Sequence, residues 1–346
     1  MQKWIVTGIS GSGRIELLQE LKTYAEQIGK NVMVHDVGAM IEEECRKQRI
    51  KYSDKRVLNL DRNLLKVLRT SALKEVLLRI AKMTDTDIHF IGVHATFRWK
   101  SRIIPGMSFQ DVLEIKPDGL LNIIGDIQTI CKINCNNPKW DEKTLPNPQE
   151  TQYWMMEEEF VTEVIGEVIN SQMYLVARRH NIQNLSDLFF SAKKKIYLSY
   201  PITAIREEHP ELLEQIQNKM LKDLEELFVV FDPLTIKDIG DMDRQFNGAL
   251  PVSLKEFDSK AKEIIKARTI ERDFQFIDQS DAVVVLYITE KLSPGVIAEI
   301  AYAHRTAKPV FMVFPFKLSP FIEDMTTSIY KTFEELIERL KSFSVE

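Results

Sequence analysis

A short segment, Ser293-Pro-Gly-Val-Ile-Ala-Glu299, carries the residues of this chain best suited to chemistry. It follows an apolar run at 281–287 that is typical of a buried strand, and it opens a predicted helix. Ser293 is a favoured N-cap residue and Pro294 suits the first helical position. The first-turn amides and the helix dipole favour an anion there, and Glu299 lies about one and a half turns further along. A phosphate-binding helix N-terminus and a carboxylate on the same helix suit an enzyme that binds a nucleotide and attacks its sugar.

Three further residues in the same half of the chain could take part in such chemistry. Departure of a base from a sugar needs a proton or a strong hydrogen bond, which Asp273 on a predicted helix at 255–279 could supply. The alternative for Asp273 is a surface acid paired with its neighbour. Arg206 is expected on the loop after the strand 195–200, where it could bind phosphate or stay solvated. Asp281 opens a strand, where it could cap the strand or contact substrate.

The C-terminal part resembles the nucleoside 2-deoxyribosyltransferase superfamily over about residues 194–325. Within it, the chain is more similar to the nucleoside 5′-monophosphate N-glycosidases. Those enzymes have a serine at the position of Ser293, where transferases of free nucleosides usually have an aspartate. An aspartate would repel a phosphate, so Ser293 favours a phosphorylated substrate. The shared residues are Tyr197-Leu-Ser-Tyr-Pro-Ile202 with Arg206, Arg272-Asp273, the strand 280–285, and Ser293-x-Gly295-x-x-x-Glu299-Ile-x-x-Ala303.

The resemblance implies a role for each matched position. Glu299 would attack the anomeric carbon and form a covalent glycosyl-enzyme, which water or a second base resolves. Asp273 would contact or protonate the departing base, and Tyr197 would orient the Glu299 carboxylate. No cofactor is required for this chemistry. The expected contacts with substrate and phosphate are Ser293, Gly295, Arg206, Ile202, Asp281 and Ser319.

Three features around this site concern specificity and assembly. Ser319 resembles a serine that in the family reaches a phosphate in a neighbouring subunit, which implies a homodimer or a higher homo-oligomer. The loop after Tyr197 carries Thr203-Ala-Ile where the monophosphate hydrolases have glycines. The segment 232–254 is expected to form a lid or a subunit contact that sets base specificity.

A glycine-rich loop, Gly8-Ile-Ser-Gly-Ser-Gly-Arg-Ile15, lies between a predicted strand and a predicted helix, which is the context of a phosphate-binding loop. The full motif ends in Gly-Lys-Ser/Thr, whose lysine reaches the outer phosphates and whose hydroxyl binds Mg²⁺. Arg14 can still bind phosphate, but Ile15 cannot coordinate a metal ion. The alternative is a retained scaffold with an empty loop. The candidate contacts for ATP or another nucleotide are Gly8, Gly11, Ser12, Gly13 and Arg14.

The N-terminal part is similar to the archaeal-type adenylate kinases over roughly residues 3–130. This resemblance rests on the glycine loop and on three further segments: Ile91-Gly-Val-His-Ala-Thr96, Ile104-Pro-Gly106 and Ile115-Lys-Pro-Asp118. Gly92 stands where that family has an acidic residue near the metal. Arg14, Ile15 and Gly92 all bear on phosphoryl transfer with Mg²⁺. The resemblance therefore implies a kinase-like domain that has lost, or much reduced, this activity.

Strands alternate with helices in both halves, which predicts an α/β protein with two parallel-sheet domains. The first is a P-loop nucleoside-monophosphate-kinase-like domain at 1–135. A linker and helical segment at 136–192 leads to a Rossmann-like or flavodoxin-like deoxyribosyltransferase fold at 193–346. Strands are expected at 4–7, 31–34, 88–93, 119–124, 195–200, 228–231, 281–287 and 309–314, and helices at 14–29, 152–190, 210–227, 255–279, 293–305 and 333–343.

The amino-acid composition bears on the possible binding partners and on the cellular location of the protein. A net charge of -5 argues against nonspecific nucleic-acid binding as the main activity. Three cysteines are too few for a disulfide scaffold and favour a reducing cytoplasm. Cys131 and Cys135 lack a second Cys/His pair to complete a zinc site, so no metal is expected. No signal peptide is visible and no apolar stretch approaches the ~20 residues that span a bilayer, so a cytoplasmic protein without a membrane partner is expected.

Several functions stay open at this stage. The favoured one is hydrolysis or base exchange at the glycosidic bond of a nucleoside 5′-monophosphate or a related nucleotide, which includes a dinucleotide such as NAD. The alternatives are a nucleotide kinase in the N-terminal domain, a 2-deoxyribosyltransferase acting on free nucleosides, and a nucleotide sensor without catalysis. The base, the sugar and the acceptor are not determined by the sequence.

Overall fold

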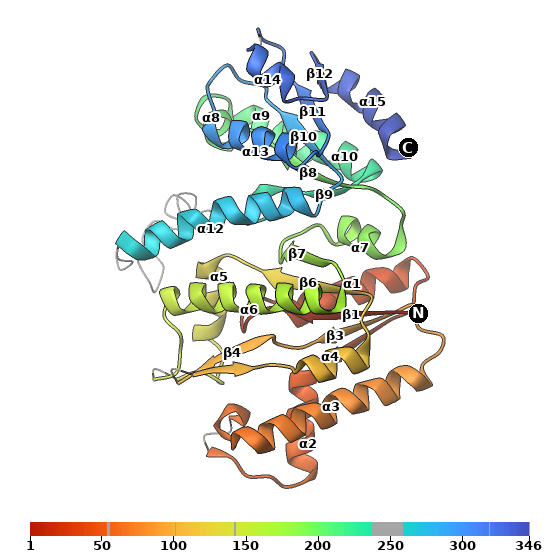
Figure 1. Cartoon of the computed structure of the whole chain (residues 1–346), viewed down its shortest axis with the longest axis vertical. Helices are drawn as coiled ribbons and strands as arrows, with labels where there is room; N and C mark the ends of the chain where they lie inside the picture. Colours follow the sequence, from red (N-terminus) through yellow and green to blue (C-terminus); the bar gives the residue numbers. More distant parts are fainter. Residues whose placement is uncertain (54–55, 101, 142, 237–258, 318, 346) are drawn as a thin grey trace. The chain divides into compact units, whose positions relative to one another are not determined.

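The computed structural model describes residues 1–53, 56–100, 102–141, 143–236, 259–317 and 319–345, and for 259–266 the backbone alone. The described chain forms two compact units (Figure 1). The first comprises Met1–Arg179 and Ile236–Glu263, and the second comprises His180–Thr235 and Ile264–Glu346. Each unit is a parallel α/β structure, as the alternation of strands and helices predicts.

The described strands of the first unit form a parallel five-stranded sheet in the order β2-β3-β1-β6-β7. Apolar side chains such as Ile5 and Phe90 are completely buried in it, which is typical of strands covered on both faces. A separate antiparallel hairpin joins β4 and β5. The strands are β1 (Gln2–Thr7), β2 (Val32–Asp36), β3 (Ile88–Gly92), β4 (Thr96–Trp99), β5 (Arg102–Pro105), β6 (Gly119–Ile124) and β7 (Met173–Ala177).

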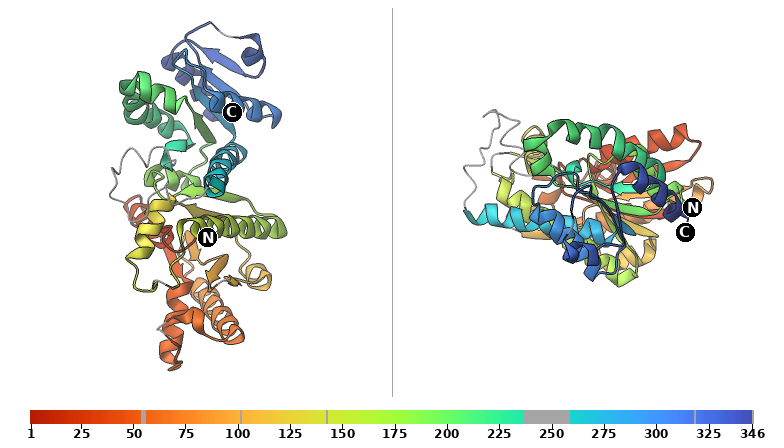
Figure 2. Two further views of the ribbon diagram at one scale, coloured as in Figure 1. Left: turned by 90° about the vertical axis from the view of Figure 1, so that its left-hand side faces the viewer. Right: turned by 90° about the horizontal axis from the view of Figure 1, so that it is seen from above.

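Helices pack on this sheet through apolar side chains. A core of buried residues that includes Ile5, Val76, Ile91 and Ile165 joins the strands to α3, α4 and α6. Helices α2 and α3 lie side by side, as the views of Figure 2 show. The helices are α1 (Arg14–Gln27), α2 (Val37–Lys47), α3 (Arg62–Lys82), α4 (Phe109–Ile115), α5 (Ile127–Cys135) and α6 (Pro148–Ile169), with a 3₁₀ turn at Val57–Asn59.

The segment between the two expected domains is divided differently from the prediction. The expected helix 152–190 ends at Asn170, whose φ of 49° is left-handed. Met173–Ala177 then forms β7, which pairs in parallel with β6. A short apolar run cannot be assigned to a helix or a strand by periodicity alone, and here pairing with a buried neighbour decides for the strand. Residues 136–179 therefore belong to the first unit.

The sheet of the second unit is also parallel, in the order β12-β11-β10-β8-β9. Read from β9, this is the doubly wound order 2-1-3-4-5, in which the chain reverses direction between its first and third strands. That switch point lies between β8 and β10, which pair directly. The strands are β8 (Lys195–Ser199), β9 (Val229–Phe231), β10 (Ala282–Leu286), β11 (Val310–Val313) and β12 (Ser328–Tyr330).

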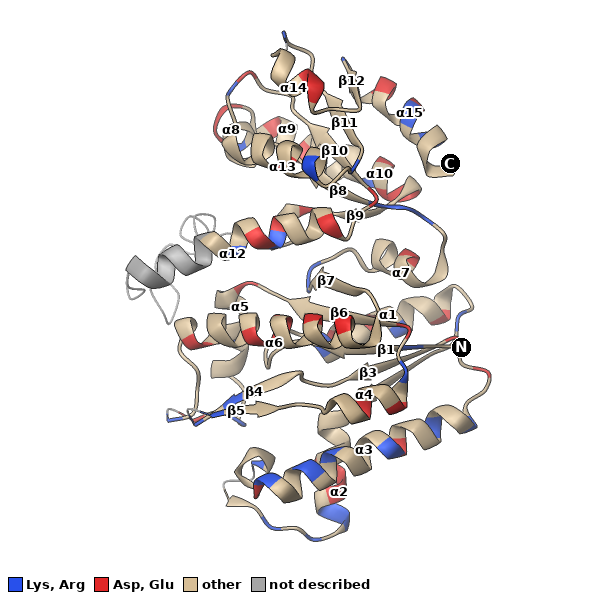
Figure 3. Cartoon of the chain, in the orientation of Figure 1, with Lys and Arg blue, Asp and Glu red and all other residues tan. Residues whose placement is uncertain are grey.

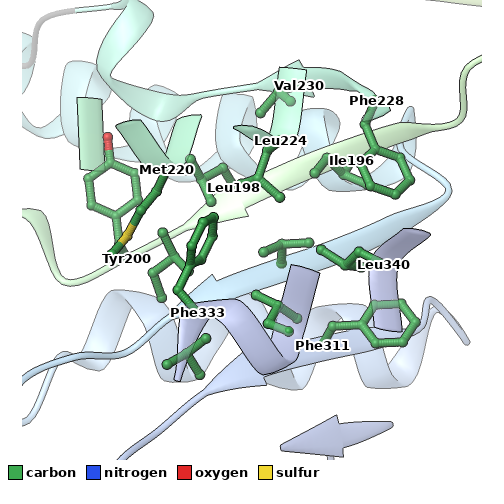
Figure 4. Close-up of a cluster of buried hydrophobic side chains, with 14 of the residues drawn as sticks. Ile196, Leu198, Tyr200, Met220, Leu224, Phe228, Val230, Phe311, Phe333 and Leu340 are labelled. Carbon is green, nitrogen blue, oxygen red and sulfur yellow. The ribbon is translucent and has the colours of Figure 1, made fainter. Parts of the chain in front are cut away.

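Alternate residues of β8 face opposite sides of this sheet. Leu198 and Tyr200 enter the buried cluster of Figure 4, which α10 and α15 complete. Tyr197 and Ser199 face the other side, where α12 and α13 lie. The helices are α7 (Ile182–Phe190), α8 (Ile202–Glu208), α9 (Pro210–Gln215), α10 (Leu221–Leu227), α12 (Ser259–Asp278), α13 (Pro294–Arg305), α14 (Pro320–Asp324) and α15 (Phe333–Val345), with a π turn at Ile216–Met220 and a 3₁₀ turn at Pro233–Thr235.

The expected helices and strands of the second half are all present, with small shifts at their ends. Helices α8 and α14 and strand β12 were not predicted from the sequence. Of the segment expected to form a lid, residues 237–254 lie outside the described residues.

Charged side chains of both signs are interspersed along the helices of each unit (Figure 3). No helix within the described ranges is long and apolar enough to cross a bilayer. Cys45 and Cys131 are buried and Cys135 is exposed, all as free thiols. The part of the chain that the structure describes contains no cluster of three or more His, Cys, Asp or Glu side chains that could hold a metal ion.

Candidate active site

Glu299 of α13 turns its carboxylate toward the sheet. The hydroxyl of Ser199, the last residue of β8, donates a hydrogen bond to Glu299 Oε2 at 2.5 Å. Ser199 pairs in register with Val285 of β10. The contact therefore lies at the carboxyl ends of the two strands that flank the switch point, where open α/β sheets bind their ligands.

A second carboxylate and an arginine lie beside this contact. Asp273 and Arg272 of α12 form an ion pair with an Nη2–Oδ1 distance of 2.8 Å, and their side chains are 15% and 8% exposed. Burial and the negative charge of Asp273 raise the pKa of Glu299 to about 8, against the opposing effects of Ser199, Tyr197 and Arg272. The two carboxyl groups are thus close enough for the charge of Asp273 to act on Glu299.

Tyr197 lies two residues before Ser199 on the same face of β8 and is completely buried. Its ring packs on Phe276 of α12, with 6.4 Å between the centroids. Burial and the charges of Glu299 and Asp273 raise the pKa of the Tyr197 hydroxyl. That hydroxyl has no hydrogen-bond partner of good geometry among the described residues. It lies near Glu299, but the well-formed hydrogen bond to the carboxylate comes from Ser199.

The sequence reading did not single out Ser199, although a signal for it exists. Side chains two residues apart on a strand share a face, so Tyr197 and Ser199 had to lie together. Only the packing of α13 shows that this face meets Glu299.

The first turn of α13 is open. Ser293 occupies the N-cap position and Pro294 the first helical position, as predicted, but the Ser293 side chain makes no capping hydrogen bond. The Ser293 backbone N–H donates instead to the Tyr287 hydroxyl at 2.7 Å. That hydroxyl donates to the Lys291 carbonyl at 3.2 Å, so Tyr287 holds the loop before the helix. A Cβ on Gly295 would meet no heavy atom within 4 Å.

Two expected substrate contacts lie on α8, after β8. Arg206 lies on this helix and not on a loop, and it is partly exposed. Ile202 is its first residue, and its side chain packs against the core cluster. The backbone N–H of Ile202 donates to the carbonyl of Tyr200 at 2.8 Å, so this amide is already engaged.

Two other expected contacts are not brought to Glu299. Asp281 precedes β10 and accepts a hydrogen bond from the backbone N–H of Lys195 at 2.7 Å, with an ion pair to Lys195 Nζ at 3.2 Å. It lies at the amino ends of β8 and β10, opposite the edge of Ser199, and the geometry favours the capping interpretation. Ser319 is exposed at the start of α14, and no described contact joins it to Glu299.

The glycine loop of the first unit packs tightly on its own chain. Gly8, Gly11 and Gly13 have positive φ angles of 142°, 84° and 74°. A Cβ on Gly11 would lie 2.9 Å from Asn134 Oδ1, and one on Gly13 would lie 2.6 Å from Arg178 Nε. The positive φ angles therefore favour glycine at all three positions, and at Gly11 the Ile130 carbonyl, 2.9 Å from such a Cβ, also leaves no room for a side chain.

The side chains of the loop turn inward. Arg14 is buried and donates from Nη1 to the carbonyl of Gly8 at 2.6 Å. Ser12 is 1% exposed, and its hydroxyl has no partner within the described ranges. A Cβ on Gly92 would lie 2.6 Å from Ile15 Cδ1. The Ile15 methyl thus fills the space in which a side chain at position 92 would begin, and this pair offers no ligand for Mg²⁺.

A buried carboxylate accepts hydrogen bonds from the backbone of the glycine loop. Glu158 of α6 is 1% exposed, and its Oε1 accepts from the backbone N–H groups of Gly8 at 3.0 Å and Ala95 at 2.9 Å. Its Oε2 accepts from the Thr96 backbone N–H at 2.6 Å and hydroxyl at 3.0 Å. One carboxylate therefore joins the residue after β1 and the start of β4 to α6.

Replacing this carboxylate should destabilise the first unit. In Glu158→Gln, the amide NH₂ group faces donors that an oxygen faced before, which should lower the free energy of unfolding by about 2–4 kcal/mol. All four tryptophans, Trp4, Trp99, Trp140 and Trp154, lie in the first unit, so urea unfolding followed by tryptophan fluorescence reports this unit alone. The control is Glu157→Gln, which breaks a partly exposed pair with Arg98 and should cost less than about 1 kcal/mol. Equal midpoints for the two variants would contradict this role of Glu158.

The chain was compared with protein families, curated proteins and solved structures. No family model and no curated protein matches the chain. A 2-deoxyribosyltransferase from Bacillus psychrosaccharolyticus is similar at 19% identity and a TM-score of 0.29, over 41% of this chain and 90% of that one. A conserved protein from Enterococcus faecalis V583 is similar at 19% identity and a TM-score of 0.28, over 44% of this chain and 99% of that one. The kinase-like resemblance of the N-terminal part finds no support in these comparisons.

Proposed function

We propose that the second unit cleaves the N-glycosidic bond of a nucleoside 5′-monophosphate or a related nucleotide, with Glu299 as the nucleophile. The observation that carries the proposal is the position of the Glu299 carboxylate, which contacts Ser199 at the carboxyl ends of the central strands. The same helix presents an open first turn at Gly295. Four residues separate the two positions, about 6 Å along the helix axis. A phosphate at the first turn would leave the sugar carbon near Glu299.

The coupled carboxyl groups suggest how the proton moves. Two nearby carboxyl groups hold one proton more readily than two negative charges. In the proposed reaction, the proton that Glu299 holds at rest passes to Asp273 when the substrate binds, and Glu299 then attacks C1′ as a carboxylate. The C1′–N bond breaks, its electron pair goes to the base nitrogen, and Asp273 supplies the proton. Asp273 then takes a proton from the water that releases the sugar from Glu299, or a second base takes the place of water.

The test is release of free base from a panel of nucleotides. Ribo- and deoxyribonucleoside monophosphates, free nucleosides and NAD are incubated with the protein and separated by chromatography, with and without a second, isotopically labelled base. Release from a monophosphate is expected, and label in a new nucleotide would identify a transferase. Preference for free nucleosides would refute the proposal that the first turn of α13 binds a phosphate. Binding of the panel without release of any base would refute the glycosidic function and favour a sensor.

The role of the first unit stays a prediction. The contact of Ile15 with the Gly92 position speaks against a Mg²⁺-dependent kinase centre. The glycine loop remains a proposed binding site for ATP or another nucleotide, in which the inward-turned side chains of Ser12 and Arg14 would have to move to reach a phosphate. A homo-oligomer with Ser319 at its interface is likewise a proposal.

A further inference from the structure

We propose that Ser199 is a positioning residue for the nucleophile: its hydroxyl holds Oε2 of Glu299 and leaves Oε1 as the oxygen that attacks C1′. This inference rests on the proposed function. It assigns a role to a residue that matches no expected site position, and it distinguishes the two oxygens of the carboxylate.

Ser199 is placed rigidly enough for this role. The residue is completely buried and pairs through β8 with β10. The next residue, Tyr200, faces the opposite side of the sheet, where its hydroxyl donates to Asp232 Oδ1 at 2.8 Å and accepts from Gln217 Nε2 at 2.8 Å. The end of β8 is therefore held on both faces, and the Ser199 hydroxyl has little freedom to follow a moving carboxylate.

The hydrogen bond acts on charge as well as on orientation. A hydroxyl that donates to a carboxylate favours its ionised form. The groups that face Glu299 are Tyr197 and Ser199 from β8, and Arg272 and Asp273 from α12. Burial and Asp273 favour the protonated form, while the two hydroxyls and Arg272 oppose them. Ser199 is the one among these whose hydrogen bond to the carboxylate has good geometry in the described structure.

The position of Oε1 follows from this arrangement. Oε2 accepts the hydrogen bond from Ser199, so its electron density is partly engaged. The Tyr197 hydroxyl also lies near the carboxylate, but among the described residues no hydrogen bond of good geometry reaches Oε1. In the step itself, the Oε1–C1′ bond forms as the C1′–N bond breaks, and the proton from Asp273 goes to the departing base. Oε2 becomes the carbonyl oxygen of the glycosyl ester and keeps the hydrogen bond from Ser199.

The experiment compares Ser199→Ala with a matched control. Ser280→Ala removes another buried hydroxyl of this unit, which donates to the Phe276 carbonyl at 2.6 Å near the amino end of β10. Base release and the ¹³C chemical shift of the Glu299 carboxyl carbon are measured against pH. Ser199→Ala should lower kcat about 10- to 100-fold with little change in KM, and should move the Glu299 titration midpoint up by about one pH unit. Ser280→Ala should change neither.

The outcomes separate the inference from the proposed function. An unchanged Glu299 midpoint, or equal losses of kcat in the two variants, would overturn the role of Ser199. Ser199→Thr keeps the hydroxyl and should restore the midpoint even if its extra methyl group lowers stability. Failure of the wild-type protein to release base from any nucleotide would refute the proposed function and the role of Oε1, whereas a shifted midpoint in the same samples would still show that Ser199 holds the carboxylate.

Discussion

Glu299→Gln is expected to lower the rate of base release by about 10⁴-fold or more, the scale seen when an enzyme loses its nucleophile. The amide has the shape of the carboxyl group, and its oxygen can still accept from Ser199, so the site should keep its geometry. It cannot form the glycosyl ester, however, because a neutral amide oxygen is a poor nucleophile toward C1′. Single-turnover assays with excess protein would measure the loss.

The control for this variant is Glu334→Gln, which changes an exposed residue of α15 and should leave the rate unchanged. Nucleotide affinity, measured by calorimetry, should persist in Glu299→Gln, because the first turn of α13 is untouched. A Glu299→Gln protein that releases base within tenfold of the wild-type rate would show that this carboxylate is not the nucleophile.

The second large effect concerns stability and pH. The pKa of Glu299 rises from its ordinary value of 4.5 to about 8 in the folded protein, because its half-buried carboxyl group is desolvated and lies near the negative charge of Asp273. At a pH between these two values, Glu299 is ionised in the unfolded chain but keeps its proton in the folded protein. The free energy of unfolding of the second unit should therefore fall as the pH rises through this window, by up to about 1.4 kcal/mol per pH unit, and the slope should end above about pH 8.

Glu299→Gln provides the direct test of this slope, because glutamine does not titrate. Exchange of the slowest backbone amides of β8 and β10 would be followed from pH 5 to pH 9, with correction for the intrinsic rates. The variant should lose this part of the pH dependence and be more stable than the wild-type protein at pH 8. Parallel stability curves for the two proteins would show that Glu299 is already ionised at neutral pH. Tryptophan fluorescence of the first unit is an internal control, since that unit should respond equally in both.

Local signals account for what the sequence predicted well. The segments Lys195–Ser199 and Ala282–Leu286 form strands because each is short, largely apolar and preceded by polar residues. Ser293 and Pro294 mark the start of α13 because the preferences of a helix N-terminus act within one turn. The same local reasoning was wrong for Met173–Ala177, because pairing with β6 outweighs a helical pattern of apolar residues.

The amino-acid sequence by itself determined two parallel α/β units and the helix that carries Glu299. Only the tertiary structure decided which groups meet: the Ser199 hydroxyl with Glu299, the Gly8 backbone N–H with Glu158, and the Lys195 backbone N–H with Asp281 at the edge away from the site. The reason is that strand order and register bring together residues far apart in the chain. These are properties of the assembled sheet, which no local pattern encodes.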